Sequence, residues 1–558
     1  MSPLMMPRFI TILLLTISNL FLSQNYKITY QSFFEGKPQE DKDKIIVYTN
    51  SDESYIFSEN LLSKNTVYPY EINKILPQTS TVYSYGFLRD NEIIALIDEK
   101  QLSAQKFTYA EDTKKILGYE CKKAIIHINS NTIELWYTHD LKNLKGSPSL
   151  LGQNLGLVLE ITRNGTYTTR AIAVKKEKNN PVAGMIPTNT ETLDALSYKD
   201  RMWKSRFTTI PIFDSVQIHF ANSLLKHSII KKFGHGTVVI RKVQFPKINH
   251  DQQVFAELKQ ISNGDAYDRI GSVFIIPQNK EKSFLDALEK GIDSVPHFSY
   301  NGKTYKGMIA TPDYAPAIEL MRFFTPFGIQ KFNHIALKGK KWHNEAHYRQ
   351  DITELATALS GKELWVGVYI GNYDAGGHLV SMDISVHPSG KNLWKNTTAI
   401  PLFNTVNIME NAGQGYATLF ENKDGLKVHF KLDKPLKNTH LRYITTGHGG
   451  WENGDEFVPK ENIFYLNGQK VYQFIPWRTD CGSYRLYNPA SGNFQNGLSS
   501  SDYSRSNWCP GTVTSPVYIP LGNLSPGEHT LQLIIPQGAP EGGSFSYWST
   551  SGVLIGEK

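Results

Sequence analysis

Residues 379–386 read LVSMDISV, and from Val380 onward apolar and polar side chains alternate. Successive side chains of a strand point to opposite faces, so this alternation is typical of a strand with one buried face. Residues 237–243, 272–276 and 364–370 also have strand patterns. The composition, with 12% aromatic residues and 42 glycines, favours strands and turns over helices. We therefore expect an all-β chain.

The chain is long enough for several domains, because 558 residues exceed what one hydrophobic core usually organises. A region rich in Pro, Thr and Asn, residues 179–190, and the polar stretch 197–205 indicate a first boundary, and residues 388–395 a second. Short helical patterns occur at 283–291 and 351–359. Further strand patterns lie at residues 27–33, 44–48, 92–97, 123–128, 132–137, 157–162, 167–174, 426–432, 441–445, 528–535 and 544–555. We expect a β-rich N-terminal domain at 24–200 and two sandwich-sized domains at 205–390 and 395–558.

The first residues have the pattern of a signal peptide, which we place at residues 1–23. Arg8 precedes the apolar run 9–22, and the small residue Ser23 ends it. The run is shorter than the roughly 18 apolar residues of a spanning helix. We expect a secreted or periplasmic protein that does not associate with a membrane.

Charge and cysteine content limit the partners and the redox state. The formal net charge is +7, and loss of Arg8 with the signal peptide leaves 7 − 1 = +6. The lysines are dispersed, so a solvated surface explains them better than a nucleic-acid partner. Three cysteines in an exported chain predict one bridge and one odd thiol.

Two segments gather residues that suit catalysis or binding. Asp268 and Arg269 form a carboxylate–guanidinium pair where a Gly-containing loop enters a strand, although such a pair can also be a structural anchor. The Gly-rich loop 445–457 collects polar and aromatic groups on flexible backbone, which is typical of a binding loop. A solvated acidic hairpin is the alternative. The candidate residues of the binding loop are His448, Trp451, Glu452, Asp455 and Glu456.

A third segment combines cysteine with groups that suit sugars. A bridge between Cys481 and Cys509 would pin a polar loop that contains Arg505 and Trp508. A purely structural disulfide would account for the cysteines but not for these neighbours. The motif HNEAH at 343–347 lacks the Glu that zinc proteases carry directly after the first His, so we expect no metal site.

Taken in order, these segments resemble the peptide N-glycosidase F family of bacterial glycoasparagine amidases over residues 209–557. The landmarks are residues 267–275, 318–326, 351–361, 441–449, 455–457 and 505–511. The resemblance implies two adjacent eight-stranded antiparallel jelly-roll sandwiches with the site in the cleft between them. It assigns the two catalytic carboxylates to Asp268 and Glu456, and the active-site arginines to Arg269 and Arg505.

The chain departs from the family pattern at two places. The family's third acidic residue falls near Tyr369, so its role is either lost or taken by Asp374. Two short family disulfides have no cysteines here, and Gly454 and Val458 occupy one of these pairs.

The N-terminal block resembles the extra domain of the type II form of the enzyme. An accessory glycoprotein-binding surface, a cap over the cleft and a stability domain all fit it. Cys121 lies in this block, and we expect a buried or free thiol there.

The activity implied is hydrolysis of the amide between asparagine and the first N-acetylglucosamine of N-glycans. Partners would be N-glycosylated proteins and glycopeptides, bound at the chitobiose core by a monomer without a cofactor. Tyr267, Trp451 and Trp508 offer flat faces for sugar rings, and His448 belongs to the same predicted binding set. An endo-acting glycosidase that uses the same carboxylates is one alternative. A non-catalytic lectin or adhesin is another.

Overall fold

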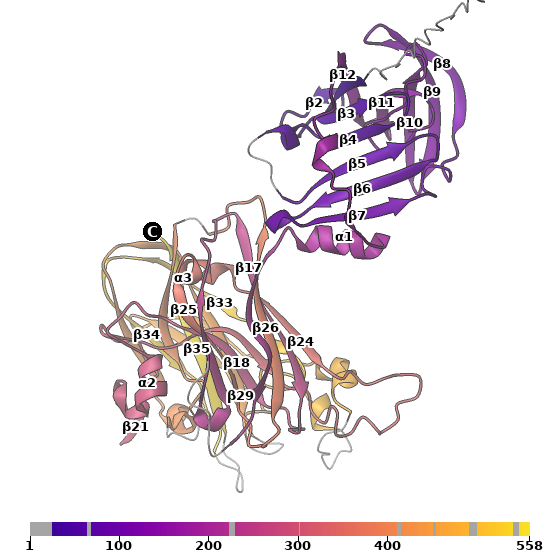
Figure 1. Cartoon of the computed structure of the whole chain (residues 1–558). Helices are drawn as coiled ribbons and strands as arrows, with labels where there is room; N and C mark the ends of the chain where they lie inside the picture. The colour runs from indigo at the N-terminus through magenta and orange to yellow at the C-terminus, as the bar shows by residue number, and fades with distance from the viewer. Residues whose placement is uncertain are drawn as a thin grey trace, which may run out of the picture. The chain divides into compact units, whose positions relative to one another are not determined.

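The structure is a computed structural model that describes residues 25–63, 68–221, 229–300, 302–394, 396–409, 414–449, 454–489, 499–539 and 546–558. The predicted signal peptide at 1–23 and Trp451 lie outside these ranges. The chain divides into two compact units. The first ends at Arg206, and the second begins at Phe207. Strands dominate both units, which confirms the all-β class (Figure 1). Within the described residues, no helix is both long enough and apolar enough to cross a membrane.

The first unit is built on one curved sheet with the strand order β13-β7-β6-β5-β4-β3-β1-β12-β11-β10-β9-β8, and β2 pairs with β1 at its side (Figure 1). Neighbouring strands are antiparallel except β13 and β7. The strands are β1 Asn25–Phe34, β2 Lys37–Pro38, β3 Ile45–Thr49, β4 Ser54–Ser58, β5 Tyr70–Leu76, β6 Thr81–Phe87, β7 Ile93–Asp98, β8 Thr108–Ile116, β9 Tyr119–Ile128, β10 Asn131–Thr138, β11 Leu157–Arg163, β12 Tyr167–Glu177 and β13 Glu191–Thr192.

A helix closes this unit where the sequence pattern predicted only a polar boundary stretch at 197–205. Helix α1 spans Ala195–Lys204, and the Asp194 carboxylate caps it by accepting hydrogen bonds from the backbone N–H of Leu196 and Ser197, both at 3.0 Å. Tyr198 is buried against Ile94 of β7. One apolar face is thus enough to dock a helix that is otherwise polar.

Cys121 on β9 is buried and unbridged, as expected from the odd cysteine count. Burial raises the pKa of its thiol to about 11. A neutral thiol of this kind packs as a small apolar side chain.

The second unit begins with a sandwich whose two sheets enclose one apolar core. Its four-stranded sheet has the order β14-β26-β17-β24, and its six-stranded sheet the order β15-β16-β25-β18-β23-β32. The strands are β14 Thr208–Ile218, β15 Ile230–Phe233, β16 Val238–Gln244, β17 Gln252–Ser262, β18 Ile270–Ile276, β23 Ile318–Phe324, β24 Ala346–Asp351, β25 Glu363–Ile370, β26 His378–Pro388 and β32 Val513–Thr514. The described residues therefore supply more strands than the eight expected for this sandwich, and β32 comes from the last block of the chain.

The second sandwich has two four-stranded sheets, β27-β35-β29-β33 and β28-β34-β30-β31, as the resemblance implied. A separate apolar core lies between them. Its strands are β27 Thr397–Asn404, β28 Leu426–Leu432, β29 Leu436–His448, β30 Asn462–Leu466, β31 Gln469–Phe474, β33 Val517–Leu524, β34 Gly527–Ile534 and β35 Tyr547–Glu557.

Short elements decorate the first sandwich. The predicted helix at 283–291 is α2, Phe284–Lys290, with a capping box formed by Ser283 and Asp286. The predicted helix at 351–359 is a 3-10 turn, Thr353–Leu355, that continues into α3, Ala356–Leu359. Two-stranded pairs complete the unit: β19 Lys282–Ser283 with β22 Tyr314–Ala315, and β20 His297–Tyr300 with β21 Lys303–Lys306.

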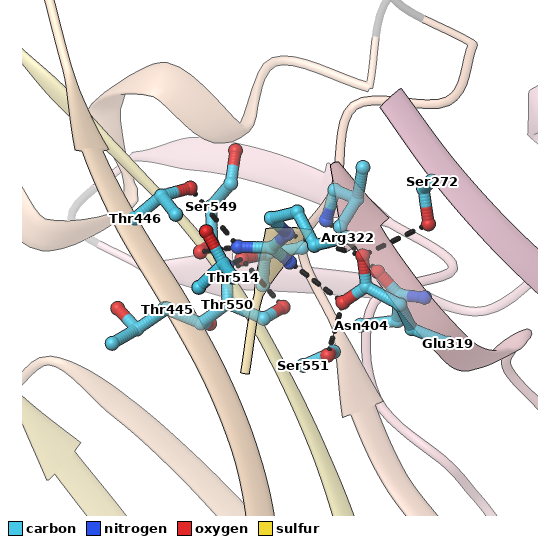
Figure 2. A network of polar contacts seen from close by, with 12 residues as sticks. Ser272, Glu319, Arg322, Asn404, Thr445, Thr446, Thr514, Ser549, Thr550 and Ser551 are labelled. Atoms are coloured by element: carbon cyan, nitrogen blue, oxygen red, sulfur yellow. Dashed lines mark hydrogen bonds and ion pairs between the residues drawn. The ribbon is translucent and has the colours of Figure 1, made fainter. Parts of the chain in front are cut away.

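A buried polar network joins the two sandwiches (Figure 2). Arg322 of β23 is fully buried and pairs with Glu319 at 2.7 Å. Its Nη1 atom donates to Thr446 of β29 at 3.1 Å and to the carbonyl of Ser549 in β35 at 2.6 Å. Since both charges are paired and hydrogen-bonded, the junction can be buried without an isolated charge.

Candidate active site

Asp268 lies in the loop directly before β18, in the first sandwich. Thr325, at the end of the paired strand β23, fixes the backbone on both sides of it. The Thr325 hydroxyl donates to the carbonyl of Tyr267 at 2.7 Å and accepts from the N–H of Arg269 at 2.8 Å. The pairing of Ile270 with Phe324 places Thr325 beside this loop. The β18–β23 register therefore determines where Asp268 stands.

Arg505, in the segment between β31 and β32, joins the two predicted catalytic carboxylates. Its Nη1 atom lies 3.2 Å from Oδ2 of Asp268 and 2.6 Å from Oε1 of Glu456. Glu456 lies in the loop that follows β29, and the carbonyl of Glu456 accepts a hydrogen bond from Ser506 at 3.0 Å. Both carboxylates keep about a fifth of their side-chain surface exposed, at 20% and 18%. The fold thus brings three predicted residues together at the junction of the sandwiches.

Burial makes both carboxylates harder to ionise. It raises the pKa of Asp268, while the Arg505 guanidinium acts in the opposite direction. It raises the pKa of Glu456 to about 7, opposed by Arg505 and reinforced by the charge of Asp268. Two neighbouring carboxylates beside one guanidinium favour a state in which only one of them is ionised.

Aromatic rings enclose Arg505. The Cζ atom lies 4.3 Å from the ring centre of Trp508 and 5.1 Å from that of Phe457. The Nε atom is buried and has no hydrogen-bond partner among the described residues. The prediction that Trp508 offers a face to sugars is wrong, because this indole is 3% exposed, stacks on Phe324 at 4.1 Å and donates to the carbonyl of Gly447 at 2.9 Å.

His448 is interior rather than exposed to ligand. It is 5% exposed, stacks on Tyr547 at 4.9 Å and meets the Thr446 hydroxyl at 2.7 Å through Nε2. Burial, together with the charges of Arg322 and Arg505, holds its pKa well below the usual value. The structure therefore places a neutral imidazole behind the site, and direct substrate contact by His448 is corrected to a packing role.

Arg269 and Tyr267 flank Asp268 in the chain, and Tyr267 is exposed while Arg269 is partly buried. The Arg269 guanidinium pairs with the buried Asp265 at 2.8 Å rather than with Asp268. It also lies 4.7 Å from the ring centre of Tyr267 and 5.8 Å from that of Tyr373, and both tyrosines are more than half exposed. Although burial acts in the opposite sense, the nearby His378 ring, 3.6 Å away, and the hydrogen bond from Arg269 hold the pKa of Asp265 at about 2.

The two candidates for the third acidic position are Tyr369 and Asp374. Tyr369 is 2% exposed and lines a cavity of about 90 Å³ with Ile270 and Tyr547. Asp374 accepts hydrogen bonds from the N–H groups of Gly376 and Gly377 at 2.7 and 2.9 Å, so it closes its own loop.

A disulfide joins Cys481 and Cys509, as predicted from the sequence. The bridged segment contains Arg505, and the backbones of Arg478 and Arg505 exchange hydrogen bonds of 2.8 and 2.9 Å. The bridge therefore closes the loop that presents the guanidinium to both carboxylates.

Comparisons with known proteins cover nearly the whole chain. Residues 28–200 match the family model described as N-glycanase peptide, N-terminal domain. Residues 209–386 and 415–555 match the models for the N-terminal and C-terminal parts of peptide-N-glycosidase F. A crystal structure of PNGF-II is 54% identical, with a TM-score of 0.89 over 96% of this chain and 100% of that one. The chain belongs to the peptide N-glycosidase F family.

A second PNGF-II structure, from another crystal form, gives the same identity and a TM-score of 0.86 over 96% of this chain and 98% of that one. PNGase F, described as a glycosylasparaginase from Flavobacterium meningosepticum, is 16% identical over 63% of this chain and 96% of its own, with a TM-score of 0.43. A search of curated proteins finds no match.

In this member of the peptide N-glycosidase F family, sequence reasoning did not assign Asp265 or Tyr373 to the site, and it noted Phe457 only as an aromatic that the family retains after the second carboxylate. Asp265 stands three positions before Asp268 in the same loop, and residue type alone does not distinguish which carboxylate pairs with Arg269. Phe457 carried a signal, since it follows Glu456 directly.

Proposed function

We propose that the protein is a peptide N-glycosidase that hydrolyses the amide between asparagine and the first N-acetylglucosamine of N-glycans. The observation that supports this most directly is the Arg505 guanidinium between Asp268 and Glu456, which come from two different sandwiches. Membership of the peptide N-glycosidase F family supports the same reaction class.

Asp268 acts as the general base in this proposal. An ionised carboxylate that keeps some exposure can accept a proton from the attacking water, and a raised pKa brings its basicity closer to the working pH. The water oxygen bonds to the amide carbon, the C–N bond breaks, and the proton passes to the departing nitrogen. The products are an aspartate-containing peptide and a glycosylamine.

Arg505 stabilises the charge that develops on the carbonyl oxygen. Its guanidinium is fully buried beside the two carboxylates, so it acts on this oxygen through its positive charge rather than by direct contact. A preorganised positive charge in a water-poor site stabilises an oxyanion more strongly than water does. The same guanidinium favours the ionised form of Asp268, against the effect of burial.

Glu456 orients the amide or the first sugar. With a pKa of about 7, its carboxyl can be present as an acid near neutral pH. A protonated carboxyl donates a hydrogen bond, whereas an ionised one only accepts. Tyr267 and Tyr373 are exposed and contact the Arg269 guanidinium, and they offer faces for sugar rings.

Mass spectrometry of a defined N-glycopeptide tests the reaction. The wild type should convert the glycosylated asparagine to aspartate, and Asp268→Asn should abolish the conversion while thermal unfolding stays cooperative. Asp383→Asn, on β26 in the four-stranded sheet of the same sandwich, is the matched control and should remain active. A product that keeps N-acetylglucosamine on asparagine would identify a glycosidase. Binding of the glycopeptide without turnover would identify a lectin, and full activity of Asp268→Asn would exclude the proposed base.

A further inference from the structure

Asp455 precedes Glu456 in the chain and is fully buried. Its Oδ2 atom accepts a hydrogen bond of 2.8 Å from the indole N–H of Trp548 on β35. The N–H of Gly538 lies 3.0 Å from both carboxylate oxygens. The Lys460 ammonium is 3.7 Å away. The carboxylate is thus held from three sides by groups of the second sandwich.

The backbone of Asp455 is anchored as well. Its N–H donates to the hydroxyl of Ser546 at 3.1 Å, and its carbonyl accepts a hydrogen bond from the hydroxyl of Ser506. Ser506 also donates its N–H to the carbonyl of Glu456. Because Ser506 directly follows Arg505, one cluster of contacts fixes both members of the Arg505–Glu456 pair.

Two glycines show how closely this cluster is packed. A Cβ atom at Gly538 would lie 2.7 Å from Oδ1 of Asp455. A Cβ atom at Gly447 would lie 2.8 Å from the Asp455 carbonyl oxygen, from Cβ of Ser506 and from Cζ2 of Trp548. The segment that carries Glu456 therefore has little room to shift toward either neighbour.

We propose that Asp455 is a positioning residue that sets the distance and orientation between Glu456 and Arg505, an inference that rests on the proposed function. A buried carboxylate is costly, and apolar groups of the same shape often stabilise a core at least as well. An anchored carboxylate has a fixed orientation, because the N–H groups of Trp548 and Gly538 determine where its two oxygens lie. A displacement of about 1 Å in a catalytic group can lower turnover about a hundredfold.

The test uses the full chain and a glycopeptide substrate, with Trp548→Phe, Asp455→Leu and the double variant. Trp548→Phe removes the indole donor but leaves an aromatic ring in the core. Each single variant should lower kcat by about tenfold or more, with KM changed by less than about threefold. The double variant should be no slower than the slower single variant, because both changes break the same contact.

Tyr443→Phe is the matched control. It removes a buried hydrogen bond of 2.7 Å to Asn462 in the same sandwich, and its kcat should stay near that of the wild type. Wild-type kcat in Trp548→Phe, equal losses in the control, or additive losses in the double variant would each overturn the positioning role.

A crystal structure of Trp548→Phe separates this inference from the proposed function. The distance from Oε1 of Glu456 to Nη1 of Arg505 should leave the hydrogen-bonding range, whichever reaction the protein catalyses. An unchanged pair would reject the anchor. A displaced pair, together with a wild type that does not convert asparagine to aspartate, would reject the reaction and keep the anchor.

Discussion

Nη1 of Arg505 lies 2.6 Å from Oε1 of Glu456, although 49 positions separate the two residues. This contact only partly offsets the effect of burial, because the pKa of Glu456 still rises to about 7 from the ordinary 4.5. The site therefore holds a carboxyl that is easier to protonate in the folded chain than in the unfolded chain.

Glu456→Gln should change how stability depends on pH. Between pH 4.5 and about 7 the folded wild type binds a proton that the unfolded chain releases, so its unfolding free energy falls as the pH rises through this window. Glutamine does not ionise, so the variant does not lose this unfolding free energy as the pH rises. Its stability relative to the wild type should increase by about 1–3 kcal/mol between pH 4.5 and pH 8, measured by urea unfolding. Glu528→Gln, at an exposed position of β34, should run parallel to the wild type. A difference in unfolding free energy between Glu456→Gln and the wild type that does not change with pH would contradict the raised pKa of Glu456.

Removal of the disulfide should reduce both stability and turnover. The bridge joins residues 28 positions apart, so a Cys481→Ala/Cys509→Ala variant should lose about 3–4 kcal/mol of unfolding free energy in the chain-entropy model. Because Arg505 lies within the bridged segment, kcat should fall as well. Cys121→Ala, which removes the buried thiol of the first unit, should leave kcat unchanged. Wild-type kcat in the double cysteine variant would show that the loop is held without the bridge.

Arg322→Met should be strongly destabilising, because it leaves the buried Glu319 carboxylate without its cation (Figure 2). The expected cost is about 3–5 kcal/mol of unfolding free energy in denaturant titration. Adding Glu319→Gln should recover part of this loss. Lys204→Met, which breaks the exposed pair with Asp200 on α1, should cost less than about 1 kcal/mol. Equal losses of unfolding free energy in Arg322→Met and Lys204→Met would show that the contribution of the network does not depend on burial.

Local pattern was a good guide to the strands. The alternation at 426–432 coincides with β28, Leu426–Leu432, and the pattern at 157–162 with β11, Leu157–Arg163. It failed at α1, where many polar residues masked the helix, although Asp194 provides an N-cap signal. Strand periodicity depends on adjacent residues, so it can be read locally, whereas a short docked helix depends on its partner sheet.

The family resemblance predicted the charged members of the site better than residue type predicted the aromatic ones. Asp268, Glu456 and Arg505 meet as expected, because few groups other than each other can compensate these charges at a partly buried junction. Trp508 and His448 were assigned to ligand binding but are buried. An indole or imidazole serves equally well in a core or against a sugar. For Trp508, stacking on Phe324 from the other sandwich places the indole in the core.

The sequence by itself determined the β conformation of most segments, the bridged cysteine pair and, through the order of its motifs, the family resemblance. Only the tertiary structure decided which charges meet: Arg505 reaches Asp268 across 237 positions, while Arg269, adjacent to Asp268, pairs with Asp265. Conformation along a strand follows from neighbours within a few residues. The pairing of distant charges follows from how two separate apolar cores pack, and no local pattern encodes it.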